Sequence, residues 1–171
     1  MRENREYSFE SFRRNEGNEE AFQIMKKAAG YNLTAVPNPI WLTGKSGTGK
    51  THLLYALKRE LEQKEQKKTT RIVSCHDLMR ELIAVFSWDV YEDAIQDYVE
   101  RFCREDVIMI EDVDYCLRGG EASQVELVRL IRILVEKYEK QVVLTAYEEF
   151  VTFADWLKMK MQTGIVVQLK K

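Results

Sequence analysis

The sequence is short of several features that would place it in a special class. No apolar run approaches the ~20 residues that a membrane-spanning helix needs. The net charge is only −2, so the chain lacks the strongly basic balance typical of proteins that bind nucleic acid non-specifically. These absences argue against a membrane protein and a generally basic DNA-binding protein, although they leave a local basic patch open.

Cysteine is scarce as well. Cys75, Cys103 and Cys116 are far apart and none forms a C-x-x-C pair, which predicts a reduced, intracellular chain. The first residues contain no apolar signal segment, so we expect a cytoplasmic location. With 45% hydrophobic and 32% charged residues in 171, the composition is typical of one soluble globular domain with a real core.

A glycine-rich loop is the most informative stretch. The apolar run from Ile40 to Leu42 enters it, and a helix-forming stretch leaves it, from Lys50 to about Gln63. The fixed positions of the phosphate-binding pattern G-x-x-x-x-G-K-[ST] are occupied by Gly44, Gly49, Lys50 and Thr51. The spacing therefore predicts a strand–loop–helix unit that binds phosphate.

The chemistry of the loop suits a nucleotide with Mg²⁺. Glycines allow backbone N–H groups to turn towards a phosphate, and the helix that follows presents its positive dipole end. Lys50 supplies a charge for the β- and γ-phosphates, and the Thr51 hydroxyl is a candidate Mg²⁺ ligand. The neighbouring positions Ser46, Gly47, Thr48 and His52 are further candidate nucleotide contacts. For His52, a structural role is the alternative.

Two acids follow the buried-type strand Val107–Ile110, where a nucleotide-binding α/β protein holds its metal. We interpret Glu111 as a Mg²⁺ ligand, directly or through water, and Asp112 as the residue that orients or activates the attacking water. Which acid has which task stays open, and a solvated acidic turn is the structural alternative.

Strands alternate with helices along the chain, which predicts a parallel α/β sheet with right-handed crossovers. Besides the first strand at Ile40, we expect strands at Arg71–Ser74, Val107–Ile110, Gln141–Thr145 and Ile165–Leu169. We expect helices from about Asn18, which would cap the first one, from His76, and over Trp88–Arg104. Residues 18–171 are predicted to form one domain, preceded by an irregular segment at 1–17.

Five segments of the chain each match a different motif of one known family: Tyr7–Phe12, Asn38–Gly44, Gly49–Leu54, Ile110–Val113 and Gln141–Thr145. Together they resemble the AAA+ domain of the bacterial replication initiator DnaA family, whose G-K-T-H-L-L is matched in full. The resemblance implies a P-loop NTPase core of five parallel strands that binds ATP or ADP with Mg²⁺. It also implies that the opening segment lies against the adenine, with Phe12 and Asn18 as neighbours of the base.

The chain departs from this family where hydrolysis is concerned. Glu111 stands in place of an aspartate, Tyr147 in place of a polar sensor, and Lys160 in place of the arginine finger. Lysine lacks the bidentate fork of arginine, so we expect slow or negligible hydrolysis. The resemblance ends at Lys171, before the family's lid and DNA-binding domain, so the chain is either an excised core or a natural short relative.

DNA contact through this domain is expected to be weak. The segment Trp88–Asp106 corresponds to the family's DNA-contacting helices, yet it carries seven acids against two arginines, and an acidic face repels phosphate. We expect replication proteins or self-assembly as partners, and no membrane. The leading interpretation is a nucleotide-switched domain in replication initiation or its control. A helicase-loader-type ATPase activated in trans and an interaction module with structural ADP are the alternatives.

Overall fold

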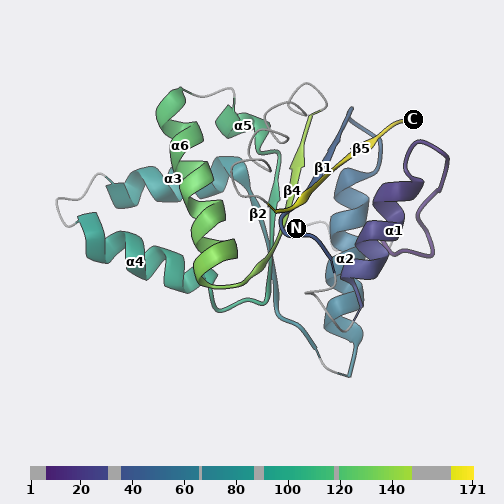
Figure 1. The fold of residues 1–171 in the computed structure, drawn as a ribbon, viewed down its shortest axis with the longest axis horizontal. Helices are drawn as coiled ribbons and strands as arrows, with labels where there is room; N and C mark the ends of the chain where they lie inside the picture. The colour runs from purple at the N-terminus through teal and green to yellow at the C-terminus, as the bar shows by residue number, and fades with distance from the viewer. Residues whose placement is uncertain (1–6, 31–35, 66, 87–90, 118–119, 148–162) are drawn as a thin grey trace.

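The computed structural model describes residues 7–30, 36–65, 67–86, 91–117, 120–147 and 163–171. At the centre of this part of the chain lies a five-stranded sheet with the strand order β2-β3-β4-β1-β5, in which all neighbours run parallel (Figure 1). The strands are β1 (Ile40–Gly44), β2 (Thr70–Ser74), β3 (Val107–Glu111), β4 (Gln141–Ala146) and β5 (Ile165–Leu169). The predicted α/β class and its parallel sheet are confirmed.

Helices cover both faces of the sheet (Figure 1). One face carries α1 (Glu19–Ala28) and α2 (Lys50–Gln63). The other carries α3 (Cys75–Phe86), α4 (Tyr91–Phe102), α5 (Asp114–Leu117), α6 (Glu121–Arg132) and the π-helical turn η2 (Ile133–Lys137). The short α5 and the π-helical turn go beyond what the sequence predicts.

Strand β3 shows why the sheet needs two cores. Its side chains alternate, so Val107 and Met109 pack with the α1–α2 layer while Ile108 and Ile110 pack with the α3–α6 layer. All four are fully buried, which explains the unbroken apolar run in the sequence. None of the helices in the described ranges combines the length and the apolarity required to cross a bilayer.

Two local expectations need correction. Asn18 occupies the N-cap position of α1, but its side chain makes no capping hydrogen bond. Its amide instead serves the preceding loop, accepting from the backbone N–H of Asn15 at 2.8 Å and donating to the carbonyl of Arg13 at 3.1 Å. The helix expected over Trp88–Arg104 is described from Tyr91 and ends at Phe102, two residues earlier than expected, whereas Trp88 lies outside the described residues.

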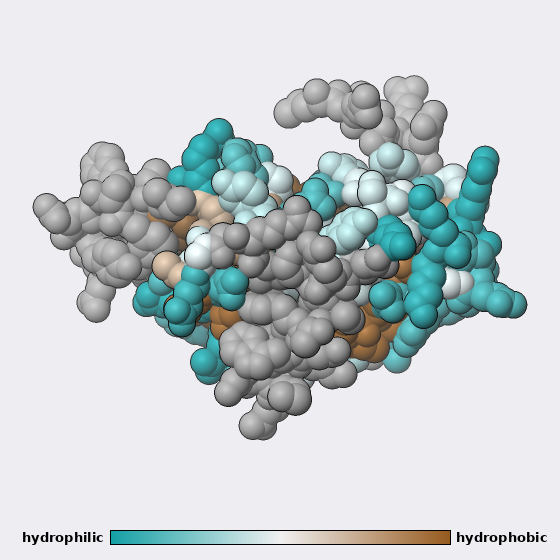
Figure 2. Space-filling view, turned by 90° about the horizontal axis from the view of Figure 1, so that it is seen from above, coloured by the Kyte–Doolittle hydropathy of each residue, from teal (hydrophilic) through white to brown (hydrophobic). Residues whose placement is uncertain are grey.

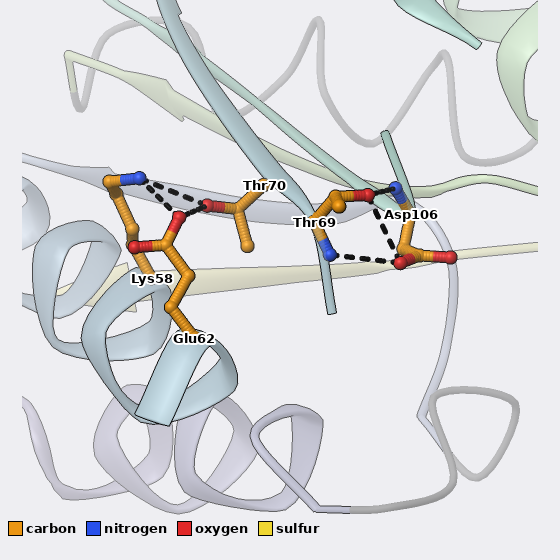
Figure 3. A network of polar contacts seen from close by, with 5 residues as sticks. All are labelled: Lys58, Glu62, Thr69, Thr70 and Asp106. Atoms are coloured by element: carbon orange, nitrogen blue, oxygen red, sulfur yellow. Dashed lines mark hydrogen bonds and ion pairs between the residues drawn. The ribbon is translucent and has the colours of Figure 1, made fainter. Parts of the chain in front are cut away.

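A polar network joins α2 to the sheet at the amino ends of β2 and β3 (Figure 3). The Thr70 hydroxyl donates to Glu62 at 2.7 Å, and Glu62 also pairs with Lys58 one helical turn earlier. Next to them, Asp106 accepts from the Thr69 backbone N–H at 2.9 Å. The contact between Thr70 and Glu62 attaches the C-terminal end of α2 to β2, while the N-terminal end of the helix adjoins the glycine-rich loop.

The prediction of three reduced cysteines is wrong for this structure. Cys75 and Cys116 form a disulfide across 41 positions of sequence, with their Cα atoms 6.6 Å apart, whereas Cys103 is free. Sequence spacing could not show this, because the pairing arises from α3 and α5 packing side by side on one face of the sheet. The bond joins the segment after β2 to the segment that follows the acids of β3.

We predict that the unreduced, denatured protein exposes one alkylatable thiol and that the reduced protein exposes three. Because cross-linking restricts the unfolded chain, reduction should lower the melting temperature by roughly 5–15 °C. Mass spectrometry after alkylation and thermal denaturation with and without reductant measure both effects. Cys103→Ser is the control, since this variant should retain the response to reductant; three reactive thiols without reductant would contradict the disulfide.

Candidate functional site

The glycine-rich loop follows β1 directly and leads into α2 at the carboxyl edge of the sheet. Gly49 has a φ of +105°, and a Cβ there would lie 2.6 Å from Cε2 of Phe12. Gly44 has a φ of +155°, and a Cβ there would lie 2.5 Å from the carbonyl oxygen of Leu169. Glycine is therefore required at both ends of the loop, by backbone conformation and by the close approach of neighbouring segments.

Lys50 is the first residue of α2 and its side chain turns back over the loop. Its ammonium group donates to the carbonyl of Gly44 at 2.6 Å and to that of Lys45 at 3.1 Å. The Thr48 hydroxyl also donates to the Lys45 carbonyl, at 2.8 Å. The loop thus holds a cation beside the N-terminus of α2, which is an arrangement suited to an anion.

Glu111 ends β3 beside the start of α2. Thr51 lies near enough to the Glu111 carboxyl group to lower its pKa as a hydrogen-bond donor, so the two residues that the sequence predicts as Mg²⁺ ligands are neighbours. Partial burial raises the pKa of Glu111; the hydrogen bond from Thr51 opposes this shift, and the neighbouring charge of Asp112 adds to it.

Asp112 is held in an unusual backbone conformation with a φ of +54°. Its N–H donates to the Thr145 hydroxyl at 3.0 Å, and the next N–H, of Val113, donates to the Thr145 carbonyl at 2.9 Å. Desolvation raises the pKa of Asp112, Asp114 raises it further, and Lys50 lowers it. Thr145 is a positioning residue that the sequence analysis missed, although a threonine in an otherwise apolar strand was a usable signal.

A cavity of about 380 Å³ opens beside the loop. It is lined by Ser11, Phe12, Arg13, Asn15, Asn18, Gly47, Thr48, Gly49, His52, Lys170 and Lys171. Figure 2 looks onto this end of the molecule, where the strands end, and shows hydrophilic surface gathered on the side of α1 and α2. The opening segment, the loop and the end of β5 therefore form one polar hollow.

Phe12 and Asn18, the residues that the sequence places near a base, both line this cavity. His52 lines it too, and also anchors the opening segment: its Nε2 lies 2.8 Å from the carbonyl oxygen of Ser8, and its ring meets Phe12 edge-on with centroids 5.1 Å apart. This position is compatible with both roles considered for His52, a nucleotide contact and a structural residue. The structure adds Arg13, Lys170 and Lys171, which sequence reasoning did not assign to a site.

The remaining sequence candidates are distributed as follows. Ser46 lies exposed in the loop. Tyr147 lies one position beyond β4, at the same edge of the sheet as Asp112. Lys160 lies outside the described residues, so the structure gives it no position. Arg129 and Arg132, considered as a basic spot, pair with Glu126 and Glu136 on the surface of α6 and η2.

The donor set fits Mg²⁺ bound together with phosphate. Thr51 and Glu111 would supply hard oxygen ligands, and Mg²⁺ in such sites commonly takes one or two protein ligands and completes its shell with water and phosphate oxygens. Among the residues described, no cluster of three or more His, Cys, Asp or Glu side chains could hold a metal ion.

The comparison with known protein families agrees with this geometry. The bacterial DnaA ATPase domain matches residues 3–168, nearly the whole chain. The chain belongs to this family. The DnaA initiator of Aquifex aeolicus is 28% identical over 172 residues, which cover 98% of this chain and 40% of that protein. The chain thus spans less than half the length of this curated relative.

Solved structures show the same relationship. AMPPCP-bound DnaA from Aquifex aeolicus superimposes with a TM-score of 0.77 at 25% identity, covering 98% of this chain and 50% of that one. The DnaC helicase loader superimposes with a TM-score of 0.68 at 15% identity, covering 96% of this chain and 97% of that one, which shows a shared fold. The five-stranded AAA+ P-loop core expected from the sequence is confirmed.

We predict that Glu111→Gln stabilises the ligand-free protein at neutral pH. A raised carboxyl pKa means that ionisation is unfavourable in the folded state, so stability is lost as pH rises through the folded-state pKa. The glutamine keeps an acceptor for Thr51 without the charge. The melting temperature at pH 7 should rise by about 2–4 °C, and this gain should shrink as pH falls towards 4.

Glu19→Gln is the matched control for this prediction. Hydrogen bonds from Arg14 and Gln23 lower the pKa of Glu19 to about 2, so its ionised form is the favoured one in the folded state. Removing that charge should leave the melting temperature unchanged or lower it. A destabilised Glu111→Gln variant at pH 7 would contradict the inference that burial makes ionisation of Glu111 unfavourable in the folded protein.

Proposed function

We propose that this chain is a nucleotide-binding domain that takes ATP or ADP with Mg²⁺. The phosphates would lie on the loop from Gly44 to Thr51, and the base would enter the cavity between Phe12 and Asn18. The proximity of Thr51 to Glu111 carries the proposal, because it places a hydroxyl at the end of the loop next to the acid of β3, and such a pair can hold one metal ion.

The relatives support the same ligand. A solved DnaA of Aquifex aeolicus holds AMPPCP, an ATP analogue, and superimposes over 98% of this chain. Lys50, Thr51 and the glycines of this chain stand at the positions that the phosphate-binding pattern requires. We extend the ligand class to this chain and add Gly47, Thr48 and His52 as contacts.

We further propose that the domain acts in the initiation of DNA replication or in its control, with the bound nucleotide as a switch. A switch requires that a partner distinguishes the ATP form from the ADP form. The groups that contact the γ-phosphate and the metal would transmit the difference. Glu111 is linked to Thr51, and the Asp112 backbone is fixed by Thr145, so a change at the phosphates would reach β3 and β4 together.

Intrinsic hydrolysis is proposed to be slow. Glu111 is one methylene longer than the family's aspartate, Tyr147 is the sensor-position residue, and Lys160 stands where an arginine finger is expected. Loss of an arginine finger costs on the order of 10³–10⁵ in rate in related phosphoryl-transfer enzymes. DNA contact is proposed to be weak as well: a related DnaA structure contains single-stranded DNA, whereas Asp97, Glu100 and Glu105 bring acid to the corresponding region here.

We predict that the wild type binds ATP and ADP with micromolar or tighter affinity in Mg²⁺, and that Lys50→Ala weakens both by more than about 10-fold, equivalent to ~1.4 kcal/mol. The reason is that Lys50 carries the charge facing the phosphates. Isothermal titration calorimetry measures the affinities, with Lys67→Ala as the control, since Lys67 lies beyond the opposite end of α2. Undetectable binding by the wild type would contradict the proposal.

We also predict a turnover below about 1 s⁻¹ for ATP hydrolysis by the chain alone, in the lower part of the range of ordinary enzymes. A phosphate-release assay with the Asp112→Asn variant as background measures it. Faster turnover by the chain alone would contradict slow hydrolysis and, with it, the switch interpretation. Strong stimulation by single-stranded DNA would favour a helicase-loader-type ATPase instead.

A further inference from the structure

The end of β5 brings a lysine to the phosphate-binding loop. Leu169 pairs in register with Gly44, the first residue of the loop, so the next residues of the chain run alongside the loop. The Cε and Nζ atoms of Lys171 both lie 3.7 Å from the position that a Cβ on Gly47 would occupy. An ammonium group therefore rests against the middle of the loop, at Gly47, whereas Lys50 reaches the carbonyls of Gly44 and Lys45.

The backbone fixes this position. The N–H of Lys170 donates to the carbonyl of Gly17 at 2.8 Å, and a Cβ on Gly17 would come within 2.8 Å of the Lys170 Cβ. The tail is thus held between the sheet on one side and the opening segment on the other. Although the Lys171 side chain is exposed, its starting point beside the loop is set by the ladder of β1 and β5.

The charge around the cavity is one-sided. Arg13, Lys170 and Lys171 are among its lining residues, and none of its lining residues in the described part of the chain has a carboxylate side chain. Uncompensated positive charge facing a concave polar wall favours an anionic ligand. The phosphates of a nucleotide on the loop would lie within reach of Lys171, while the base would be turned towards Phe12 and Asn18.

We propose that Lys171 is a second cationic phosphate-binding residue, which contacts the α- or β-phosphate of the nucleotide from the β5 side. The inference rests on the proposed nucleotide site and adds a specificity: Lys171 makes the site prefer polyphosphate over the bare nucleoside. Its ammonium donates hydrogen bonds to phosphate oxygens, which are stronger than bonds between neutral groups because both partners carry charge.

The test measures the affinities of ADP, AMP and adenosine in Mg²⁺ for the wild type, Lys171→Gln and Lys171→Arg. We expect Lys171→Gln to weaken ADP binding by about 5–10-fold and to leave adenosine binding within about twofold. Lys171→Arg should retain ADP binding to within about twofold, because it keeps the charge. Lys67→Gln is the control for a lysine away from the loop and should change no affinity.

Two results would overturn the inference while leaving the nucleotide site intact. One is ADP binding by Lys171→Gln equal to that of the wild type. The other is an equal loss for ADP and adenosine, which would mean that the residue only shapes the cavity. Absence of ADP binding by the wild type is distinguishable from both, and would overturn the proposed function and this inference together.

Discussion

The pairing of β1 with β4 on one side and β5 on the other brings residues from both neighbouring strands to the glycine-rich loop. Through β4, Thr145 holds the backbone after β3 and so positions Asp112. Through β5, the register of Leu169 with Gly44 brings the chain's lysines beside the loop. Because β1 lies between these two strands, the loop at its end receives residues from both directions.

The same arrangement concentrates charge that the ligand-free protein cannot fully balance. Burial raises the pKa of Glu111, and desolvation raises that of Asp112, while Lys50 is occupied by loop carbonyls. Two acids with raised pKa values beside the glycine-rich loop would be balanced by a metal ion bound together with a polyphosphate.

Much of this could be predicted from the sequence, because its signals are local. The glycine-rich pattern, the apolar run before Glu111 and the alternation of strands and helices each lie within a few residues, and the structure confirms the strands they predict. What escaped prediction depends on tertiary contacts. The Cys75–Cys116 disulfide, the side chain of Asn18 turned into its loop, and Thr145 beneath Asp112 all join segments or choose partners that spacing alone does not reveal.

The central claim is that the loop from Gly44 to Thr51 is a phosphate cradle, and a crystal structure of the chain with ADP and Mg²⁺ tests it most directly. We predict that in this complex the Lys50 ammonium leaves the Gly44 and Lys45 carbonyls for the β-phosphate, with Thr51 on the metal and Glu111 on the metal or its water. A structure with ADP elsewhere, or with Lys50 still bonded to both carbonyls beside the nucleotide, would contradict it.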